Sequence, residues 1–459
     1  MNTLSHELDQ RLTQYGQRHL LAGWEQFSPE EKKRFADELN ALNFDELQQL
    51  YQLRDQPLAA LPDRKEIEPL PVEAWNDISL ASRQIGEEAL RSGKVAALVV
   101  AGGLGSRLGF EKPKGMFPIG PVSQSSLFQI HAEKVWKLRQ LYGGAVPFLV
   151  MTSPATHDET VAFFEANQNF GLDDVHFFQQ GSMPALDLKT GQVLLEAPGK
   201  LFLGPNGHGG TLTALADSGL LARLKARGVE QIFYFQVDNP LVKIGDPAFV
   251  GRHIEKQSDV SSKVVFKTEP AERVGVLASV NGRCSIIEYS DIPREMAEER
   301  LADGTLAFRA GNPAIHCFSI AFLERITRGK DRLTYHYARK KVPYFDPQTQ
   351  SAVTPTVENA LKFELFIFDA LPLAKTWLAV SVERDDEFAP LKNATGADSP
   401  EEVRKAITRN SRKLVAQSGI DFVPPENFEV GPKFALHADE IRHKQEQNQI
   451  NLLQAYWTS

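Results

Sequence analysis

The amino-acid sequence predicts an α/β protein built on a doubly wound, mostly parallel central sheet. Short continuous apolar runs recur along the chain, and such runs are typical of strands covered on both faces. Helical patterns lie between several of these runs, which is the alternation expected of parallel strands joined by crossover helices. Glycine-rich or polar segments follow several runs directly, where sheets of this kind bind ligands. The predicted strands are residues 95–100, 148–151, 176–178, 232–237 and 263–266.

The composition is that of a folded protein without a nucleic-acid or membrane partner. The chain has 459 residues, and its 51 basic and 59 acidic residues give a net charge of −8, whereas a duplex-binding protein normally carries a basic face. No apolar run approaches the ~20 residues that a membrane span needs, and residues 1–10 lack the apolar core of a signal peptide. The two cysteines, Cys284 and Cys317, suit a reducing compartment. We therefore expect a cytoplasmic protein.

The regions on either side of the central sheet have different patterns. Residues 1–92 are predicted to be helical, and Ser28-Pro29-Glu30-Glu31 combines an N-cap, a proline in the first turn and a capping-box glutamate. Asn281-Gly282 separates two strand-like runs and predicts a hairpin, and Ser399 is predicted to cap a late helix. We expect a helical N-terminal region at residues 1–92, a central domain at 93–390 and a small C-terminal domain at 391–459.

The first predicted strand leads directly into a glycine-rich loop, Ala101-Gly-Gly-Leu-Gly-Ser-Arg-Leu-Gly109. Successive glycines let the backbone aim several N–H groups into one concavity that binds phosphates. A dinucleotide fingerprint starting at Gly103 fails at Leu108, and the Gly-Lys-Ser or Gly-Lys-Thr end of a Walker loop is absent. Glycines alone would indicate a surface turn. Arg107 and Lys114 beside them supply cations for phosphate oxygens and favour a nucleotide site.

This loop and the following segment, Lys112-Pro-Lys-Gly-Met-Phe117, resemble the opening of the UDP-sugar pyrophosphorylase (UDPGP type 1, uridylyltransferase) family. The resemblance runs from about residue 95 to 394 with successive motifs in the family's order, and it is nearest to the UDP-N-acetylglucosamine pyrophosphorylase branch. It implies a Rossmann-like fold of the nucleotide-diphospho-sugar transferase type, with UTP and a sugar 1-phosphate as substrates. Nothing in the sequence indicates an oligomeric state.

The resemblance assigns the nucleotide end of the site to residues that follow predicted strands. Gln180 can bind the imide edge of uracil because its amide both donates and accepts, although an ordinary strand-end glutamine is the alternative. Asp238 suits Mg²⁺, which prefers one or two carboxylates together with phosphate oxygens, although a capping aspartate is the alternative. In the glycine loop, the resemblance implies nucleotide contacts from Ala101, Gly102, Gly103, Leu104 and Gly105.

The resemblance also assigns the sugar end. A second glycine loop at residues 204–210 contains Gly207 and His208, and its glycines permit close approach of the backbone to a ligand. The acetylglucosamine branch normally has asparagine where this chain has His208, and histidine there is typical of UDP-glucose pyrophosphorylases. Asn312, within a Gly-Asn pair, is by contrast the acetylglucosamine-type signature. The other sugar-side residues that the resemblance implies are Glu288, Tyr289, Lys362, Phe366 and Phe368.

The implied reaction explains why the sequence shows no nucleophile triad. The attacking group is a phosphate oxygen, so the site has to supply in-line positioning and charge stabilisation at the α-phosphorus. The resemblance implies that Arg107 and the loop amides hold the leaving pyrophosphate. It further implies that Lys114 and Lys392, with Mg²⁺ at Asp238, offset the developing charge. Arg107, Lys114 and Lys392 are therefore the candidate catalytic residues.

Three alternatives remain open from the sequence. A UDP-glucose or broad-range UDP-sugar pyrophosphorylase would share nearly all of these residues. A non-catalytic nucleotide-sugar binding protein would bind the same ligands and release no pyrophosphate. A nicotinamide-dependent oxidoreductase is compatible with a similar sheet, but its fingerprint fails at Leu108.

Overall fold

The computed structural model describes residues 4–55, 62–328 and 333–458. The chain forms two compact units. Unit 1 consists of residues 1–60, 181–210 and 333–366, and unit 2 consists of residues 61–180, 211–332 and 367–459. The domain boundaries predicted near residues 92 and 390 stay a prediction, because compactness does not show which segments fold independently.

Unit 1 packs amphipathic helices against short strands. The predicted capping box is confirmed, since Ser28 and Glu31 bond reciprocally. The next helix begins in a similar way, with the Asn43 side chain accepting from the Glu46 N–H. The helix faces bury leucine and phenylalanine side chains together with strand residues in one cluster. The helices are α1 (His6–Gln14), α2 (Pro29–Ala41) and α3 (Phe44–Gln52). The strands are β8 (Ser182–Pro184), β9 (Leu186–Asp187), β10 (Leu195–Ala197), β11 (Lys200–Leu201), β12 (Leu203–Pro205), β19 (His336–Lys340), β20 (Tyr344–Asp346), β21 (Ser351–Val353) and β22 (Ala360–Glu364).

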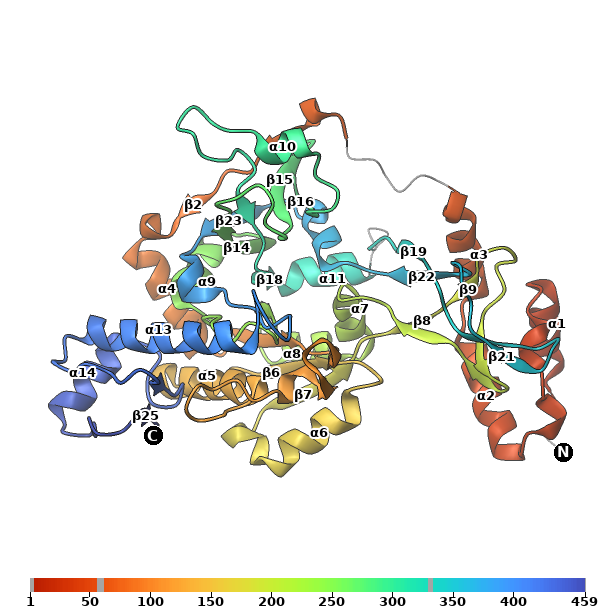
Figure 1. Ribbon diagram of the computed structural model, residues 1–459, viewed down its shortest axis with the longest axis horizontal. Coiled ribbons are helices and arrows are strands. Elements are labelled where there is room, and N and C mark those ends of the chain that lie inside the picture. Colours follow the sequence, from red (N-terminus) through yellow and green to blue (C-terminus); the bar gives the residue numbers. More distant parts are fainter. Residues whose placement is uncertain (1–3, 56–61, 329–332, 459) are drawn as a thin grey trace. The chain divides into compact units, whose positions relative to one another are not determined.

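Unit 2 contains a twelve-stranded sheet whose first part is parallel (Figure 1). In spatial order, this part consists of β7 (Val175–Gln179), β6 (Phe148–Thr152), β3 (Val95–Val100) and β13 (Gln231–Gln236). The central strand β3 is buried along its whole length. Val95, Ala97 and Val99 join the main core cluster, and the alternate residues Ala96 and Leu98, which are also buried, point to the opposite face. The predicted strands are confirmed, and all but the edge strand β7, which is largely half-buried, are covered on both faces.

The sheet becomes mixed beyond β13, because β18 (His316–Ser319) pairs antiparallel with both β13 and β14 (Val260–Phe266). Strand β23 (Trp377–Ser381) runs parallel to β14, so β3, β13, β14 and β23 all point the same way. The predicted hairpin is confirmed, and both residues of its Asn281-Gly282 turn have positive φ. Its strands are β15 (Val276–Val280) and β16 (Arg283–Ile287), and the shorter strands are β1 (Ile67–Pro69), β2 (Glu73–Ala74), β4 (Leu104–Gly105), β5 (Phe110–Pro113), β17 (Ala310–Gly311), β24 (Glu429–Val430) and β25 (Tyr456–Trp457).

Two helices beside the sheet approach each other through glycines. A Cβ on Gly86 of α4 would lie 1.9 Å from the carbonyl oxygen of Pro247, and one on Gly251 of α9 would lie 1.7 Å from that of Ser82. The remaining helices are α4 (Leu80–Arg91), α5 (Leu127–Tyr142), α6 (His157–Ala166), α7 (Gly210–Asp217), α8 (Leu220–Ala226), α9 (Pro247–Glu255), α10 (Arg294–Glu298), α11 (Ile320–Arg328), α12 (Arg384–Glu387), α13 (Pro400–Ser418) and α14 (Ala438–Glu446). Within the described ranges we find no helix with the length and apolar character that crossing a membrane requires.

The glycine contact gives a stability prediction. We expect Gly251→Ala to destabilise the protein by ~1–3 kcal/mol, because the added methyl group has to push two backbones apart. Thermal unfolding followed by circular dichroism measures this loss. Gly103→Ala is the matched control, since a Cβ there would have no neighbour within 4 Å. Equal unfolding temperatures for the two variants would contradict the close packing.

Candidate active site

The carboxyl ends of the parallel strands bring the predicted nucleotide residues to one edge of the sheet. Val100, the last residue of β3, pairs with both Met151 of β6 and Gln236 of β13. The glycine loop and Asp238 therefore emerge side by side. Strand β7 pairs in register with β6 and is followed by Gln180, which joins the same edge. This arrangement confirms the expectation that these segments converge where an open α/β sheet binds its ligand.

The glycine loop folds back on itself as a small hairpin between β4 and β5. The Lys114 N–H donates to the Gly103 carbonyl at 3.0 Å, which fixes the position of Lys114 beside the loop. Arg107 lies in a short 3₁₀ turn, Ser106–Leu108, and its side chain is exposed. Across the loop, Ala101 and Gly105 are buried, Gly102 is half-buried, and Gly103 and Leu104 are exposed. The exposed part of the loop is the part that a phosphate could reach.

Gln180 packs its side-chain amide against the glycine loop. The residue is only 8% exposed, and its N–H donates to the Thr152 carbonyl at 2.8 Å. Its amide nitrogen lies 3.1 Å from the point that a Cβ on Gly102 would occupy. A side chain at position 102 would therefore press on the amide. The two segments predicted to contact one nucleotide are neighbours.

Lys114, Asp238 and Leu391 form a compact polar cluster. The Lys114 ammonium lies 3.5 Å from Asp238 Oδ2, and the two side chains are 20% and 21% exposed. The same ammonium donates to the Leu391 carbonyl at 3.4 Å. The Leu391 N–H in turn donates to the Asp238 carbonyl at 2.8 Å. A cation and a carboxylate from distant segments are thus held together and remain accessible.

Lys392 lies close enough to several carboxylates to change their protonation. Burial raises the pKa of Asp398, the charge of Lys392 opposes this rise, and the charge of Asp238 adds to it. Burial also raises the pKa of Glu288, and Lys392 again acts in the opposite direction. The Lys392 N–H donates to the Asp398 carbonyl at 2.8 Å. Lys392 therefore shares one electrostatic environment with Asp238, although the two residues are far apart in sequence.

Glu288 and Asn312 meet at Gly275. Glu288 Oε1 lies 3.0 Å from the point that a Cβ on Gly275 would occupy, and the Asn312 N–H donates to the Gly275 carbonyl at 2.9 Å. The Asn312 side-chain oxygen accepts from the Ala314 N–H at 2.9 Å, which closes a tight turn. Tyr289 is 48% exposed beside Glu288. Two predicted sugar-side residues are therefore neighbours in space.

The predicted sugar-side residues are divided between the units, with Gly207, His208, Lys362 and Phe366 in unit 1, and Glu288, Tyr289, Asn312 and Phe368 in unit 2. Within unit 1, the centre of the His208 ring lies 5.5 Å from that of Phe366. The Lys362 ammonium lies 3.1 Å from the point that a Cβ on Gly204 would occupy. Gly207 has φ +83°, a conformation that favours glycine. The second glycine loop thus packs on strand β22 and the residues after it.

Asp238 offers an accessible carboxylate for a divalent cation. Among the residues described, no group of three or more His, Cys, Asp or Glu side chains is arranged to hold a metal ion. A single accessible carboxylate fits Mg²⁺, because this ion is commonly bound through one or two carboxylates and substrate phosphates. It fits less well a metal that is enclosed by protein ligands.

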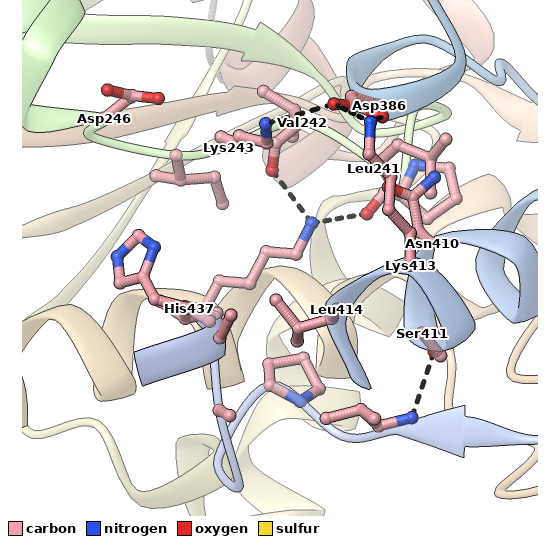
Figure 2. Close-up of a pocket in the computed structure, with 18 of the residues that line it drawn as sticks. Leu241, Val242, Lys243, Asp246, Asp386, Asn410, Ser411, Lys413, Leu414 and His437 are labelled. Carbon is pink, nitrogen blue, oxygen red and sulfur yellow. Dashed lines mark hydrogen bonds and ion pairs between the residues drawn. The ribbon is translucent and has the colours of Figure 1, made fainter. Parts of the chain in front are cut away.

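A separate cavity of about 390 Å³ lies beside residues 240–244, which follow Asp238 in the chain (Figure 2). Lys134 of α5 lines it and donates to the carbonyls of Pro240 and Val242. Burial lowers the pKa of Lys134 to about 7. None of the predicted substrate residues lines this cavity, so the candidate active site at the strand ends is a different place.

Several residues that shape the site were not predicted. Gly275 sits between Glu288 and Asn312, and the only available signal was that a glycine beside a strand often marks close backbone approach. Asn206 is 5% exposed, and its side-chain oxygen, which lies close to Gly210, has no hydrogen-bond partner among the described residues. The Asn239 side chain donates to the Glu387 carbonyl and so links the residues around Asp238 to those that lead to Lys392. Nothing in the local sequence indicates this contact.

Comparison with known proteins finds one family over most of the chain. The model of the UTP–glucose-1-phosphate uridylyltransferase family matches residues 43–418. Human UDP-N-acetylhexosamine pyrophosphorylase-like protein 1 is 37% identical over 436 residues, covering 90% of this chain and 86% of that protein. The Saccharomyces cerevisiae UDP-N-acetylglucosamine pyrophosphorylase is 35% identical over 393 residues, covering 82% of each chain. The crystal structure of the Trypanosoma brucei UDP-N-acetylglucosamine pyrophosphorylase with an inhibitor has a TM-score of 0.82 at 27% identity and covers 100% of this chain and 99% of that chain.

The fold and the family match define a nucleotidyltransferase. The chain belongs to the UTP–glucose-1-phosphate uridylyltransferase family. The family expected from the motifs is therefore confirmed, together with the sheet architecture. The enzyme class is UTP:sugar-1-phosphate uridylyltransferase, whose substrates are UTP and a sugar 1-phosphate.

The raised pKa of Glu288 gives a prediction about stability against pH. Between the unfolded and the folded pKa, the native state binds more protons than the unfolded state, so ionisation of Glu288 lowers stability as pH rises. We expect Glu288→Gln to raise the unfolding temperature relative to wild type more at pH 8 than at pH 5. Calorimetry at both pH values measures the difference. The same gain at both would mean that the carboxylate is not strained by burial.

Proposed function

We propose that this enzyme transfers the uridylyl group of UTP to N-acetylglucosamine 1-phosphate and produces UDP-N-acetylglucosamine and pyrophosphate. The observation that carries the proposal is the cluster of Lys114, Asp238 and Leu391 beside the glycine loop. It combines an anion-binding loop, a cation and an accessible carboxylate at one sheet edge. The names of the yeast and T. brucei relatives support the choice of sugar.

In the proposed reaction, a non-bridging oxygen of the sugar 1-phosphate attacks the α-phosphorus of UTP. A new phosphorus–oxygen bond forms, and the bond from the α-phosphorus to the oxygen that bridges to the β-phosphate breaks. Pyrophosphate leaves without any proton transfer, so no general base is needed. Catalysis then depends on positioning and on offsetting negative charge in the transition state.

The proposed roles follow from the positions of the side chains. Arg107 is exposed on the glycine loop and would hold the β- and γ-phosphates with the loop amides. Lys114 is fixed beside the loop and would offset charge at the α-phosphate. Lys392 would approach from the segment that follows α12. Gln180 would hold uracil beside Gly102.

We also propose Mg²⁺ as the cofactor, with Asp238 as its protein ligand. The metal, when bound, would supply positive charge between the phosphates. The Lys114 ammonium is already 3.5 Å from the Asp238 carboxylate, which supports a site that attracts cations.

Unpaired Cys284 and Cys317, both buried, support the proposal of a reducing, cytoplasmic compartment.

A second candidate function is a UDP-glucose or broad-range UDP-sugar pyrophosphorylase, and His208 is the observation that favours it. Asn312 favours N-acetylglucosamine. A coupled assay of pyrophosphate release, with UTP, Mg²⁺ and a panel of sugar 1-phosphates, decides between them. Binding of UDP-sugar without pyrophosphate release would instead indicate a non-catalytic binding protein.

The role of Lys114 can be tested directly. We expect Lys114→Ala to lower kcat about a hundredfold or more, because one charge at the transition state contributes ~3 kcal/mol to the barrier. Steady-state kinetics and far-UV circular dichroism measure rate and fold. Lys112→Ala is the matched control. The Lys112 side chain is 57% exposed, and its ammonium lies 3.9 Å from Glu159 Oε1, which is a long ion pair. A near-normal rate in Lys114→Ala would remove Lys114 from the mechanism.

The sugar preference can be tested at His208. We expect His208→Asn to raise the ratio of kcat/KM for N-acetylglucosamine 1-phosphate over glucose 1-phosphate about tenfold, which is the effect of one hydrogen-bonding group worth ~1.4 kcal/mol. His336→Asn is the matched control, because its ring also lies near Phe366, at 4.8 Å, without being assigned to the sugar. An unchanged ratio in His208→Asn would show that position 208 does not select the sugar.

A further inference from the structure

Lys263 and Glu387 form a fully buried ion pair in unit 2. The Lys263 ammonium lies 2.7 Å from both carboxylate oxygens of Glu387, and the side chains are 0% and 2% exposed. Asp246 Oδ2 lies 3.6 Å from the same ammonium, and the Trp75 and Phe249 rings lie 4.9 and 5.3 Å from it. A charge pair buried in this way favours one geometry, because neither partner can move away without losing its nearest opposite charge inside the protein.

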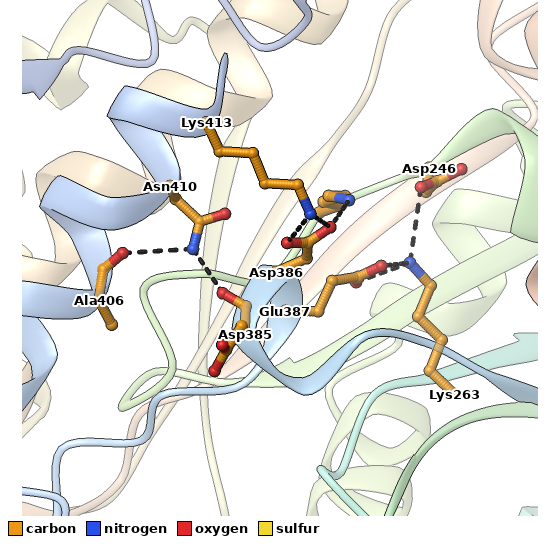
Figure 3. Close-up of polar contacts among 9 residues, drawn as sticks. Asp246, Lys263, Asp385, Asp386, Glu387, Ala406, Asn410 and Lys413 are labelled. Carbon is orange, nitrogen blue, oxygen red and sulfur yellow. Dashed lines mark hydrogen bonds and ion pairs between the residues drawn. The ribbon is translucent and has the colours of Figure 1, made fainter. Parts of the chain in front are cut away.

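The pair joins strand β14 to the segment that leads to Lys392. Lys263 is in the middle of strand β14, whereas Glu387 ends α12, at the start of the segment that leads to Lys392. We call residues 383–392 the Lys392 segment. Figure 3 shows Lys263 reaching across to Glu387, with Asp246 on its other side.

Asn239, the residue after Asp238, ties the Lys392 segment to the Asp238 segment. Its side-chain amide donates to the Glu387 carbonyl at 2.7 Å, and its side-chain oxygen accepts from the Ala389 N–H at 3.2 Å. Two residues further on, the Leu391 N–H donates to the Asp238 carbonyl at 2.8 Å. The backbone that carries Lys392 is therefore held in register with the backbone that carries Asp238.

The Lys392 segment is also held from its solvent side, but by exposed groups. Lys413 of α13 pairs with Asp386 at 2.6 Å, and Asn410 donates to the Asp385 carbonyl at 2.6 Å (Figure 3). The Lys413 side chain is 45% exposed. The Asp386 side chain is 19% exposed. Because water reaches both partners, it screens this pair more than it screens the fully buried pair of Lys263 and Glu387.

We infer that Lys263 and Glu387 are positioning residues of the transfer reaction: their buried pair sets the place of Lys392 relative to Asp238 and Lys114. Both side chains are buried within the protein, so the role assigned to them is to position Lys392 and not to contact substrate. The path runs from Glu387 through Asn239, Ala389 and Leu391 to Lys392. The inference rests on the proposed function, since it assigns the pair a role in placing a candidate catalytic lysine.

Glu387→Gln tests the inference with little change in shape. The amide still accepts one hydrogen bond from Lys263, but the charge is lost, and Lys263 is left with Asp246 as its remaining carboxylate. We expect kcat to fall tenfold or more, with KM for UTP changed less than threefold and an unchanged far-UV spectrum. Lys413→Met is the matched control, because it removes the exposed pair on the same segment, and we expect its kcat to stay within twofold of wild type.

A double-mutant cycle with Lys392→Ala separates positioning from general destabilisation. If Glu387 acts through Lys392, Glu387→Gln lowers kcat much less in the Lys392→Ala background than in wild type. An equal loss in both backgrounds, or a normal kcat in Glu387→Gln, overturns the inference. If Glu387→Gln does not fold, Asn239→Ser replaces it in the cycle, because it cuts the next link on the path from Glu387 to Lys392 and leaves the ion pair intact. Wild-type protein without pyrophosphate release would contradict the proposed function itself, before any variant is compared.

Discussion

The in-register parallel pairing of β3 with β6 and β13 is the constraint on which the site depends. These strands are covered on both faces, so their backbone groups have to be satisfied within the sheet. Once Val100 is paired with Met151 and Gln236, the positions at which β3, β6 and β13 end are fixed relative to one another. The glycine loop and Asp238 then come together without any direct sequence relation between them.

Two ion pairs of unit 2, Lys114–Asp238 and Lys263–Glu387, differ in their exposure to solvent and in the role that we assign to them. Lys114 and Asp238 are about one-fifth exposed and remain able to meet phosphates and a metal ion. Lys263 and Glu387 are fully buried and can interact only with protein. Removing one partner of such a buried pair typically costs ~3–5 kcal/mol, which makes the second pair a source of rigidity. We see the buried pair as the support on which the accessible pair relies.

Local signals in the sequence were sufficient for most of the elements. The capping residues Ser28 and Ser399 each begin a helix, as predicted, because a cap is an interaction within one turn. The Asn281-Gly282 turn is equally local. The antiparallel insertion of β18 between β13 and β14 was not predicted, because the pairing of strands more than fifty residues apart has no signature in either strand alone.

Some residues of the candidate site could also be proposed from the sequence, and others could not. Gln180 and Asp238 could be proposed from the sequence because the resemblance to the family singles them out just after two predicted strands. Their neighbours could not. Gly275, Asn239 and Glu387 have ordinary local surroundings, and their roles arise from contacts with residues that are distant in the chain.

The sequence by itself determined the class of sheet, the Asn281-Gly282 hairpin and the family, because these depend on residue types at short spacings. Only the tertiary structure decided that Lys114 faces Asp238, that Glu288 and Asn312 share Gly275, and that a buried lysine holds the segment leading to Lys392. The physical reason is that electrostatic and packing energies depend on distance in space, and the fold sets that distance independently of separation along the chain.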